Sequence, residues 1–257
     1  MQKALSIAGS DPTGGAGLQA DLQVFRANGV HGMAVVTALT VQDPTKVHQM
    51  LPAFPNVVLD QLRALLRSVP PDAVKIGALA TDDVARSVDL GMDLLDPEKR
   101  TPIVIDPVLF ASDGSALLER RAYGTLQDLI GRAHLVTPNL PEAATLTGSD
   151  VSTREGVEAA AAALVTGMGA GAALVKGGHR DGSPDDLLAL RSGGSVSFHW
   201  LDGERVETGP VHGTGCSLAS AITALLARGV ALPEAVEGGR RFVQKALRNA
   251  QEHFLVY

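Results

Sequence analysis

The sequence contains a single cysteine, no excess of positive charge and no long hydrophobic run. One cysteine cannot form a disulfide within the chain, so the composition suits a reducing compartment and we expect a cytoplasmic protein. The formal net charge of −6 argues against a general nucleic-acid-binding surface. The apolar stretch 156–173 is too short and too weakly apolar to cross a bilayer. We therefore expect neither nucleic acid nor a membrane as a partner.

Several common signatures are also missing. The first residues lead directly into a strand-like run, so we expect no signal peptide. The glycines at 14–17 do not form a Gly-x-Gly-x-x-Gly fingerprint, because Ala20 stands three residues after Gly17, and no Walker A loop is present. The seven histidines are scattered, without the Cys/His spacing of a zinc site. These absences argue against Rossmann-type dinucleotide binding, P-loop nucleotide binding and a zinc centre.

Short apolar runs alternate with segments of helical periodicity along the whole chain. The pattern predicts strands at 4–8, 33–39, 73–76, 103–105, 135–137 and 172–176, with a hairpin at 187–190 and 196–200. It predicts helices at 17–28, 57–67, 82–95, 115–130, 214–228 and 233–252, and others that begin near 141 and 153. Strands this apolar are typical of a mostly parallel sheet covered on both faces. Because no linker or internal repeat appears, we expect one α/β domain over residues 1–257.

Polar residues recur where the predicted strands end, and ligands of such sheets bind beyond the carboxyl ends of the strands. Asp106, Asn139 and Glu142 supply oxygen atoms of the kind that Mg²⁺ prefers beside substrate phosphates. Lys176 precedes two glycines and can reach a phosphate as a point charge. A structural interpretation is also open, because Asn139 and Glu142 suit a helix start and Lys176 suits a solvent-facing loop.

The segment His212-Gly213-Thr214-Gly215-Cys216 leads into a predicted helix. A glycine-rich turn at a helix start leaves backbone N–H groups unpaired, and the helix dipole adds partial positive charge there. Gly213, Thr214 and Gly215 therefore predict an anion hole for a phosphoryl group. Cys216 falls in the first turn, where the same dipole favours the thiolate. We predict phosphoryl transfer to a hydroxyl with Cys216 as the base; the alternative is a tight turn beside a buried cysteine.

Two further segments suggest a small-molecule pocket. The glycines at 14–17 open the first predicted helix and favour close backbone approach to a ligand, with Asp21 one turn further on. Gln42 follows the strand predicted at 33–39, and its amide offers a donor and an acceptor side by side. That pair matches the edge of an aminopyrimidine, where a ring nitrogen neighbours an exocyclic amine. The alternative for both residues is a solvated side chain.

As a set, these motifs resemble those of the hydroxymethylpyrimidine/phosphomethylpyrimidine kinases of thiamine biosynthesis. The matching segments are 7–21, 37–42, 74–77, 137–143, 176–179 and 212–216, which appear in the family's order. The resemblance implies a ribokinase-like three-layer sandwich, with a central mostly parallel sheet flanked by helices and little or no separate lid. It also implies a homodimer.

The resemblance further implies an activity: ATP-dependent phosphorylation of 4-amino-5-hydroxymethyl-2-methylpyrimidine and then of its monophosphate, with Mg²⁺ as the metal. The implied catalytic groups are Cys216 as base and the anion hole formed by Gly213, Thr214 and Gly215. The implied ligand contacts are Lys176 and Asn139 for ATP and phosphate, Asp106 and Glu142 for the metal, and Gln42, Gly9 and Asp21 for the pyrimidine.

Two other functions remain open on the sequence. Pyridoxal kinase is the alternative among enzymes, because pyridoxal is a similar ring that carries a hydroxymethyl group. Gln42 argues against it, since pyridoxal presents a phenolic oxygen where the pyrimidine has an amine. A non-catalytic ligand-binding protein on a kinase scaffold is the alternative from another class. Ala78 stands where family members commonly have methionine, which predicts a larger pocket.

Overall fold

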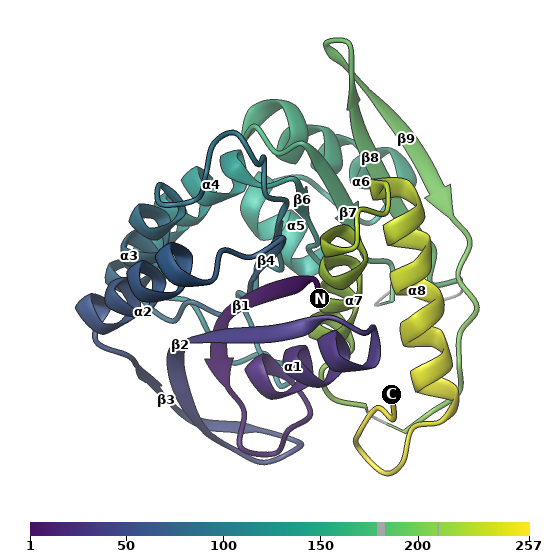
Figure 1. Cartoon of the computed structure of the whole chain (residues 1–257). Coiled ribbons are helices and arrows are strands. Elements are labelled where there is room, and N and C mark those ends of the chain that lie inside the picture. The colour runs from purple at the N-terminus through teal and green to yellow at the C-terminus, as the bar shows by residue number, and fades with distance from the viewer. Residues whose placement is uncertain (179–182, 210) are drawn as a thin grey trace.

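The computed structural model describes residues 1–178, 183–209 and 211–257. The strands of these residues join one sheet in the order β3-β2-β1-β4-β5-β6-β7-β8-β9 (Figure 1). Their bounds are β1 Lys3–Ser10, β2 His31–Gln42, β3 Val47–Pro52, β4 Ala73–Ile76, β5 Ile103–Ile105, β6 Leu135–Val136, β7 Ala172–Val175, β8 Asp186–Ser192 and β9 Ser195–Leu201. The six neighbouring strands β2, β1, β4, β5, β6 and β7 are parallel to one another. Strand β3 at one edge, and β8 and β9 at the other, pair in antiparallel fashion.

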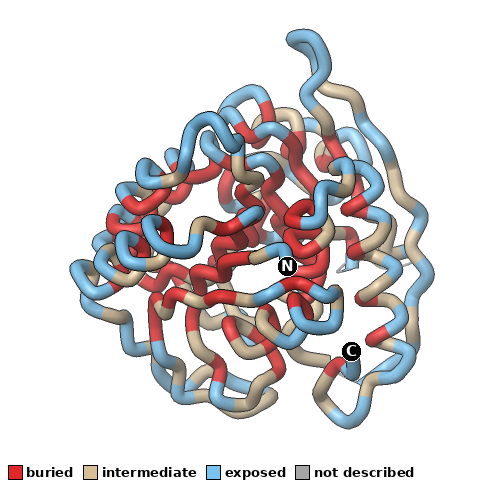
Figure 2. Tube along the Cα trace, viewed as in Figure 1, coloured by how far each residue is buried: buried red, intermediate tan, exposed pale blue. Residues whose placement is uncertain are grey.

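Helices cover both faces of the sheet, which confirms the predicted three-layer α/β sandwich. The helices are α1 Gly17–Ala27, α2 Pro55–Ser68, α3 Asp82–Met92, α4 Tyr123–Arg132, α5 Leu140–Thr147, α6 Arg154–Ala162, α7 Thr214–Ala227 and α8 Leu232–Arg248. One buried cluster includes side chains of α2 to α6, and a second includes side chains of α1, α7 and α8. The central strands β1, β4, β5, β6 and β7 lie between the clusters as a buried layer, whereas the residues of the edge strands β3 and β9 are half-buried or exposed (Figure 2).

Alternation along β1 shows why one strand serves both clusters. Leu5 and Ile7 face the first cluster, and Ala4 faces the second. Successive side chains of a strand point to opposite faces, so an apolar strand packs against both helical layers. Within the described ranges, no helix combines the length and apolar character that a membrane span requires.

Two elements differ from the predictions. The helix expected at 115–130 begins only at Tyr123, because residues before it form extended contacts: Phe110 bridges Ala116, and Leu118 bridges Ala80. Strand β3 was not predicted at all. Its burial does not alternate strictly, so it lacks the apolar period that marks a strand. Pairing with β3 extends β2 as far as Gln42, which therefore lies inside a strand and not after one.

Candidate active site

The carboxyl ends of the parallel strands open into a cavity of about 1010 Å³. The cavity brings together residues that are far apart in the sequence, as expected for a parallel sheet. Ten of the predicted site residues line it: Gly9, Gln42, Asp106, Asn139, Glu142, Lys176, Gly213, Thr214, Gly215 and Cys216. Asp21 does not. His179, the last residue of one matching motif, lies outside the described residues.

The start of α7 has the geometry of an anion-binding site. Gly213 precedes the helix with φ +79°, and no side chain caps the first turn. A Cβ on Gly213 would meet the carbonyl oxygen of Gly15 at 1.9 Å, so only glycine fits. The first backbone N–H groups of α7 therefore face the cavity without a side-chain competitor. The interpretation of this segment as a phosphate-binding turn stays a prediction, now with a matching geometry.

Cys216 lies in the first turn of α7, partly exposed and in the wall of the cavity. Burial raises the pKa of its thiol to about 11, although the positive charge of Lys75 lowers it. Asp106 and Asp21 raise the pKa further. In the unliganded protein, desolvation and two carboxylates therefore oppose the effect expected of the helix dipole, which favours the thiolate.

Asp106 and Lys176 form a buried ion pair at the ends of β5 and β7. The Lys176 Nζ atom lies 2.8 Å from Asp106 Oδ1, and Thr137 donates to the same oxygen at 3.2 Å. Burial alone would raise the pKa of Asp106, but the charges of Lys176 and Lys75 hold it below its usual range. Lys176 is therefore directed toward Asp106 and not into solvent. Asp106 Oδ2 would lie 3.8 Å from a Cβ on Gly215, which places the pair beside the helix start.

Asn139 and Glu142 form a capping box on α5, so the structural interpretation of these residues is correct. Glu142 N donates to Asn139 Oδ1 at 2.9 Å, and Asn139 N donates to Glu142 Oε2 at 2.9 Å. Both residues nevertheless line the cavity. Burial raises the pKa of Glu142 to about 7; Lys176 lowers it and Asp106 raises it. Capping fixes the orientation of these side chains without removing them from the site.

Asp21 was expected to contact the pyrimidine, but its carboxylate does not reach the cavity. It is fully buried and lies 2.8 Å from Lys75 Nζ. The Ser6 and Ser220 hydroxyls also donate to it, at 2.5 and 2.6 Å. A position one turn into α1 points this side chain inward, toward β1, β4 and α7, and not along the strand ends. Asp21 is a structural partner of Lys75 and has no direct path to a substrate.

Lys75 itself was overlooked as a candidate. It stands in the apolar strand β4, is fully buried, and still lines the cavity. Burial lowers its pKa, but the charges of Asp21, Cys216 and Asp106 together more than offset this, so the pKa lies above its ordinary value and the amine stays charged. The available signal was a lone lysine within a strand of otherwise apolar residues, since lysine is almost never fully buried without a partner.

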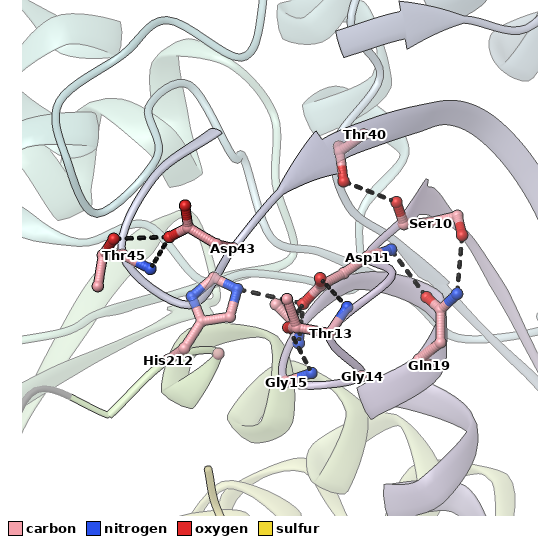
Figure 3. Close-up of polar contacts among 12 residues, drawn as sticks. Ser10, Asp11, Thr13, Gly14, Gly15, Gln19, Thr40, Asp43, Thr45 and His212 are labelled. Carbon is pink, nitrogen blue, oxygen red and sulfur yellow. Dashed lines mark hydrogen bonds and ion pairs between the residues drawn. The ribbon is translucent and has the colours of Figure 1, made fainter. Parts of the chain in front are cut away.

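Asp11 and His212 were also overlooked (Figure 3). The Asp11 carboxylate accepts from Thr13 N and Ala16 N, both at 2.8 Å, and lies 3.2 Å from His212 Nε2. Burial raises the pKa of Asp11, but hydrogen bonds from His212, Gln42 and Thr13 hold it well below its usual range. This carboxylate therefore joins the loop after β1 to the turn before α7 and to Gln42 at the end of β2.

The cavity continues away from these residues along β9 and α8. Trp200 and Leu201 line it there, together with Gln244 and Leu247 of α8. Arg240 Nε lies 2.8 Å from Asp186 Oδ2 and ties the helix to the β8 edge. One end of the cavity thus holds the glycine turn and Gln42, whereas the other is formed by β9 and α8. That arrangement has room for two ligands side by side.

Comparisons with known proteins show to which family the chain belongs. The profile of the family described as phosphomethylpyrimidine kinase matches residues 11–254. The chain belongs to the phosphomethylpyrimidine kinase family. It is 41% identical over 251 residues to a hydroxymethylpyrimidine/phosphomethylpyrimidine kinase of Mycobacterium leprae, covering 96% of this chain and 89% of the relative.

Solved structures of two kinases are similar to this chain over nearly its full length. The phosphomethylpyrimidine kinase from Clostridium difficile 630 is 33% identical with a TM-score of 0.83, covering 96% of this chain and 100% of its own. An ADP complex of Bacillus subtilis pyridoxal kinase is 32% identical with a TM-score of 0.85, covering 98% and 93%. The ribokinase-like sandwich that the resemblance implied, with a central mostly parallel sheet flanked by helices, is therefore confirmed.

Proposed function

We propose that the protein transfers the γ-phosphoryl group of ATP to the hydroxymethyl group of 4-amino-5-hydroxymethyl-2-methylpyrimidine, and then to the resulting monophosphate, in thiamine biosynthesis. One observation carries this proposal: the open helix start at Gly213 to Cys216 faces the same cavity as Gln42. A phosphoryl site and a ring-reading amide thus share one space. The family and the ADP complex of a structural neighbour support ATP as the donor.

The end of β2 supplies the recognition of the pyrimidine. Thr40 and Gln42 alternate along β2 and both line the cavity. The carbonyl oxygen of the Gln42 side chain accepts a hydrogen bond from the exocyclic amine of the ring, and its amide nitrogen donates one to the neighbouring ring nitrogen. Gly9 lets the ring approach the backbone, and Ala78 leaves space beside it. Asp21 has no part in this contact.

Asp106 and Glu142 suit Mg²⁺ in this proposal. Mg²⁺ keeps several waters and binds through one or two carboxylates together with substrate phosphates. No cluster of three or more His, Cys, Asp and Glu side chains that could hold a metal occurs among the described residues. The charge of Asp106 raises the pKa of Glu142, and a cation bound beside both carboxylates would relieve that repulsion. When bound, the metal neutralises charge on the phosphates.

In this proposal, the residues of the chain bind the phosphates and accept the proton of the acceptor hydroxyl. The N–H groups at Gly213, Thr214 and Gly215 hold the transferring phosphoryl oxygens, and Lys176 and Asn139 contact the phosphates of ATP. Cys216 accepts the hydroxyl proton as the bond to phosphorus forms. In a loose transition state this transfer is late, so the thiolate does not have to generate a free alkoxide. The second transfer, to an existing phosphate monoester, releases no hydroxyl proton and needs no base.

Pyridoxal kinase is the second candidate, favoured by the similarity to the Bacillus subtilis enzyme. The purified protein should be assayed with ATP and each of three acceptors: the pyrimidine alcohol, its monophosphate and pyridoxal. We expect phosphorylation of both pyrimidines and a kcat/KM for pyridoxal that is lower by at least about tenfold. Preference for pyridoxal would assign the second function. ATP consumption with none of the three would favour another acceptor, and binding without turnover would favour a non-catalytic protein.

We also propose that the protein acts in the cytoplasm as a single-domain subunit of a homodimer. All described strands, from β1 to β9, join one sheet, and the C-terminal helices α7 and α8 pack in the same cluster as α1, which supports a single domain. Leu39 and Val41 point away from the cavity and are 55% and 49% exposed. Leu51, the cross-strand partner of Leu39, is 46% exposed. A contiguous apolar face of this kind suits contact with a second copy.

A further inference from the structure

Lys75 is a buried charged residue that has no role in the proposed mechanism. Taking a lysine out of water costs free energy unless the charge is paired. Asp21 supplies that pairing at 2.8 Å, and both side chains are fully buried. Asp21 is the one partner recorded for the Lys75 amine among the described residues, although an ammonium carries three donors. Lys75 also borders the cavity, although its side chain has no exposed surface, so its charge lies beneath the wall of the site.

The geometry of α7 places this charge close to Cys216. Ser220 follows Cys216 by four residues, and residues at this spacing share one face of a helix. The Ser220 hydroxyl donates to Asp21 Oδ1 at 2.6 Å, while Lys75 Nζ contacts Asp21 Oδ2. Two hydrogen bonds thus connect Lys75 to the helix position one turn beyond the thiol. Both Lys75 and Cys216 line the cavity.

Glycine at position 77 preserves this arrangement. A Cβ on Gly77 would lie 2.9 Å from Lys75 Nζ and 3.1 Å from the Ala8 Cβ. Any larger residue would push the amine from its position or strain the neighbouring strand. The chain after β4 is therefore shaped to leave room for the lysine, which explains a glycine that has φ outside the left-handed region.

We propose that Lys75 is a positioning residue, which holds a positive charge beside the Cys216 thiol and favours its thiolate form, and that Asp21 keeps this lysine charged and in place. The inference deepens the proposed function, in which Cys216 is the base. The charged groups that act on Cys216 come from several elements, and the lysines oppose the carboxylates: Lys75 of β4, Lys176 after β7, Asp21 of α1, Asp106 after β5, and the Tyr257 hydroxyl.

The test measures the thiol directly and needs no substrate. Cys216 is the only cysteine, so the rate of alkylation by iodoacetamide reports its thiolate fraction as pH is varied. Replacing Lys75→Met alone would leave Asp21 buried and unpaired, so Lys75→Met is combined with Asp21→Asn. Lys75→Gln with Asp21→Asn is a second neutral pair that retains a hydrogen bond. Ser220→Ala is the matched control, because it removes a donor to Asp21 but keeps the ion pair.

Lys75 lowers the pKa of the Cys216 thiol by more than Asp21 raises it, so removing both charges leaves a net rise. We therefore expect both neutral pairs to be alkylated about three- to tenfold more slowly than the native protein at each pH from 7 to 9, with the profile displaced to higher pH. The profile of Ser220→Ala should overlay that of the native protein. Overlay of either folded neutral pair with the native profile would overturn the inference. Alkylation that shifts as expected in a protein without pyrimidine kinase activity would instead refute the proposed function and leave the role of Lys75 intact.

Discussion

In the proposed function the chemistry depends on Cys216, and the surroundings of its thiol determine how it can act. With a pKa of about 11, the thiol is almost fully protonated at neutral pH in the unliganded protein. The proposed anion hole one to three residues before it, in contrast, consists of backbone N–H groups, which do not titrate. Phosphoryl binding and proton removal therefore respond differently to mutation and to pH.

Replacing Cys216 with alanine should impair the two phosphorylations unequally. Transfer to the pyrimidine alcohol requires a proton acceptor, and we expect its kcat to fall about 10²- to 10⁴-fold. Transfer to the monophosphate requires none and should fall by less than about tenfold. Separate steady-state assays with each acceptor check this, and Cys216→Ser serves as a control of similar volume. Equal losses for both acceptors would contradict the role of base.

The pH dependence of kcat/KM should differ in the same way. Below a pKa of about 11, the thiolate fraction rises tenfold for each pH unit, so phosphorylation of the alcohol should become faster from pH 8 to 9.5. This range lies above the pKa of Glu142, about 7, so that Glu142 stays ionised throughout. Phosphorylation of the monophosphate should be flat over the range. A profile that is flat for both acceptors would contradict the role of Cys216 as the base.

Among single residues, those whose role follows from neighbours in the sequence could be predicted. Those whose role depends on a partner far away in the sequence could not. The turn at 212–216 was recognisable because glycine and a helix start are local features. Lys75 and Asp21 are 54 residues apart, and only the topology of the sheet brings them together. Asp21 was wrongly placed in the pocket for the same reason, since helical spacing alone does not say which layer a side chain meets.

Among the elements, α5 shows how one helix start serves both the fold and the site. Its capping box orients Glu142, and Leu109 N also donates to Glu142 Oε1, at 3.4 Å, which connects α5 to the chain after β5. Helix starts are well predicted from sequence, because Asn, Pro and Glu act within a few residues of one another. Strand β3 and the chain at 115–119 were not, because contacts with other segments determine their extended form.

Removing the cap should destabilise the protein measurably. We expect Asn139→Ala to lower the free energy of unfolding by about 1 kcal/mol, because the Glu142 N–H loses its partner. Thr145→Ala, on the exposed face of the same helix, is the control and should change it by less than about 0.5 kcal/mol. Urea denaturation of the three proteins measures both values. Equal stabilities for the two variants would show that the capping box is not formed in solution.

For the whole molecule, the sheet joins the pyrimidine end of the cavity to the apolar face on β2 and β3. Gln42 points into the cavity, while Leu39 and Val41 of the same strand point outward. A partner copy on that face would hold β2 and β3 in register and so fix Gln42. The overall architecture was predictable because alternating apolar segments specify a covered parallel sheet, whereas the edge that carries this face was not.

Leu51→Lys should therefore shift the protein toward the monomer. A charge at the centre of a desolvated interface is unfavourable, so we expect a lower mass by size-exclusion chromatography with light scattering. Leu90→Lys is the control, because Leu90 is 56% exposed on α3, away from this face. A native protein that is monomeric at all concentrations, or a Leu51→Lys variant that keeps the native dimer mass, would contradict the proposed interface.

The central claim is that the amides at the start of α7 hold the transferring phosphoryl group while the Cys216 sulfur faces the acceptor hydroxyl. A crystal structure with a non-hydrolysable ATP analogue and the pyrimidine alcohol tests it most directly. We predict γ-phosphate oxygens on the N–H groups of residues 213–216, the aminopyrimidine edge on Gln42, and the hydroxyl within hydrogen-bonding reach of Sγ. A γ-phosphate bound elsewhere, or a hydroxymethyl group directed away from Cys216, would contradict the account.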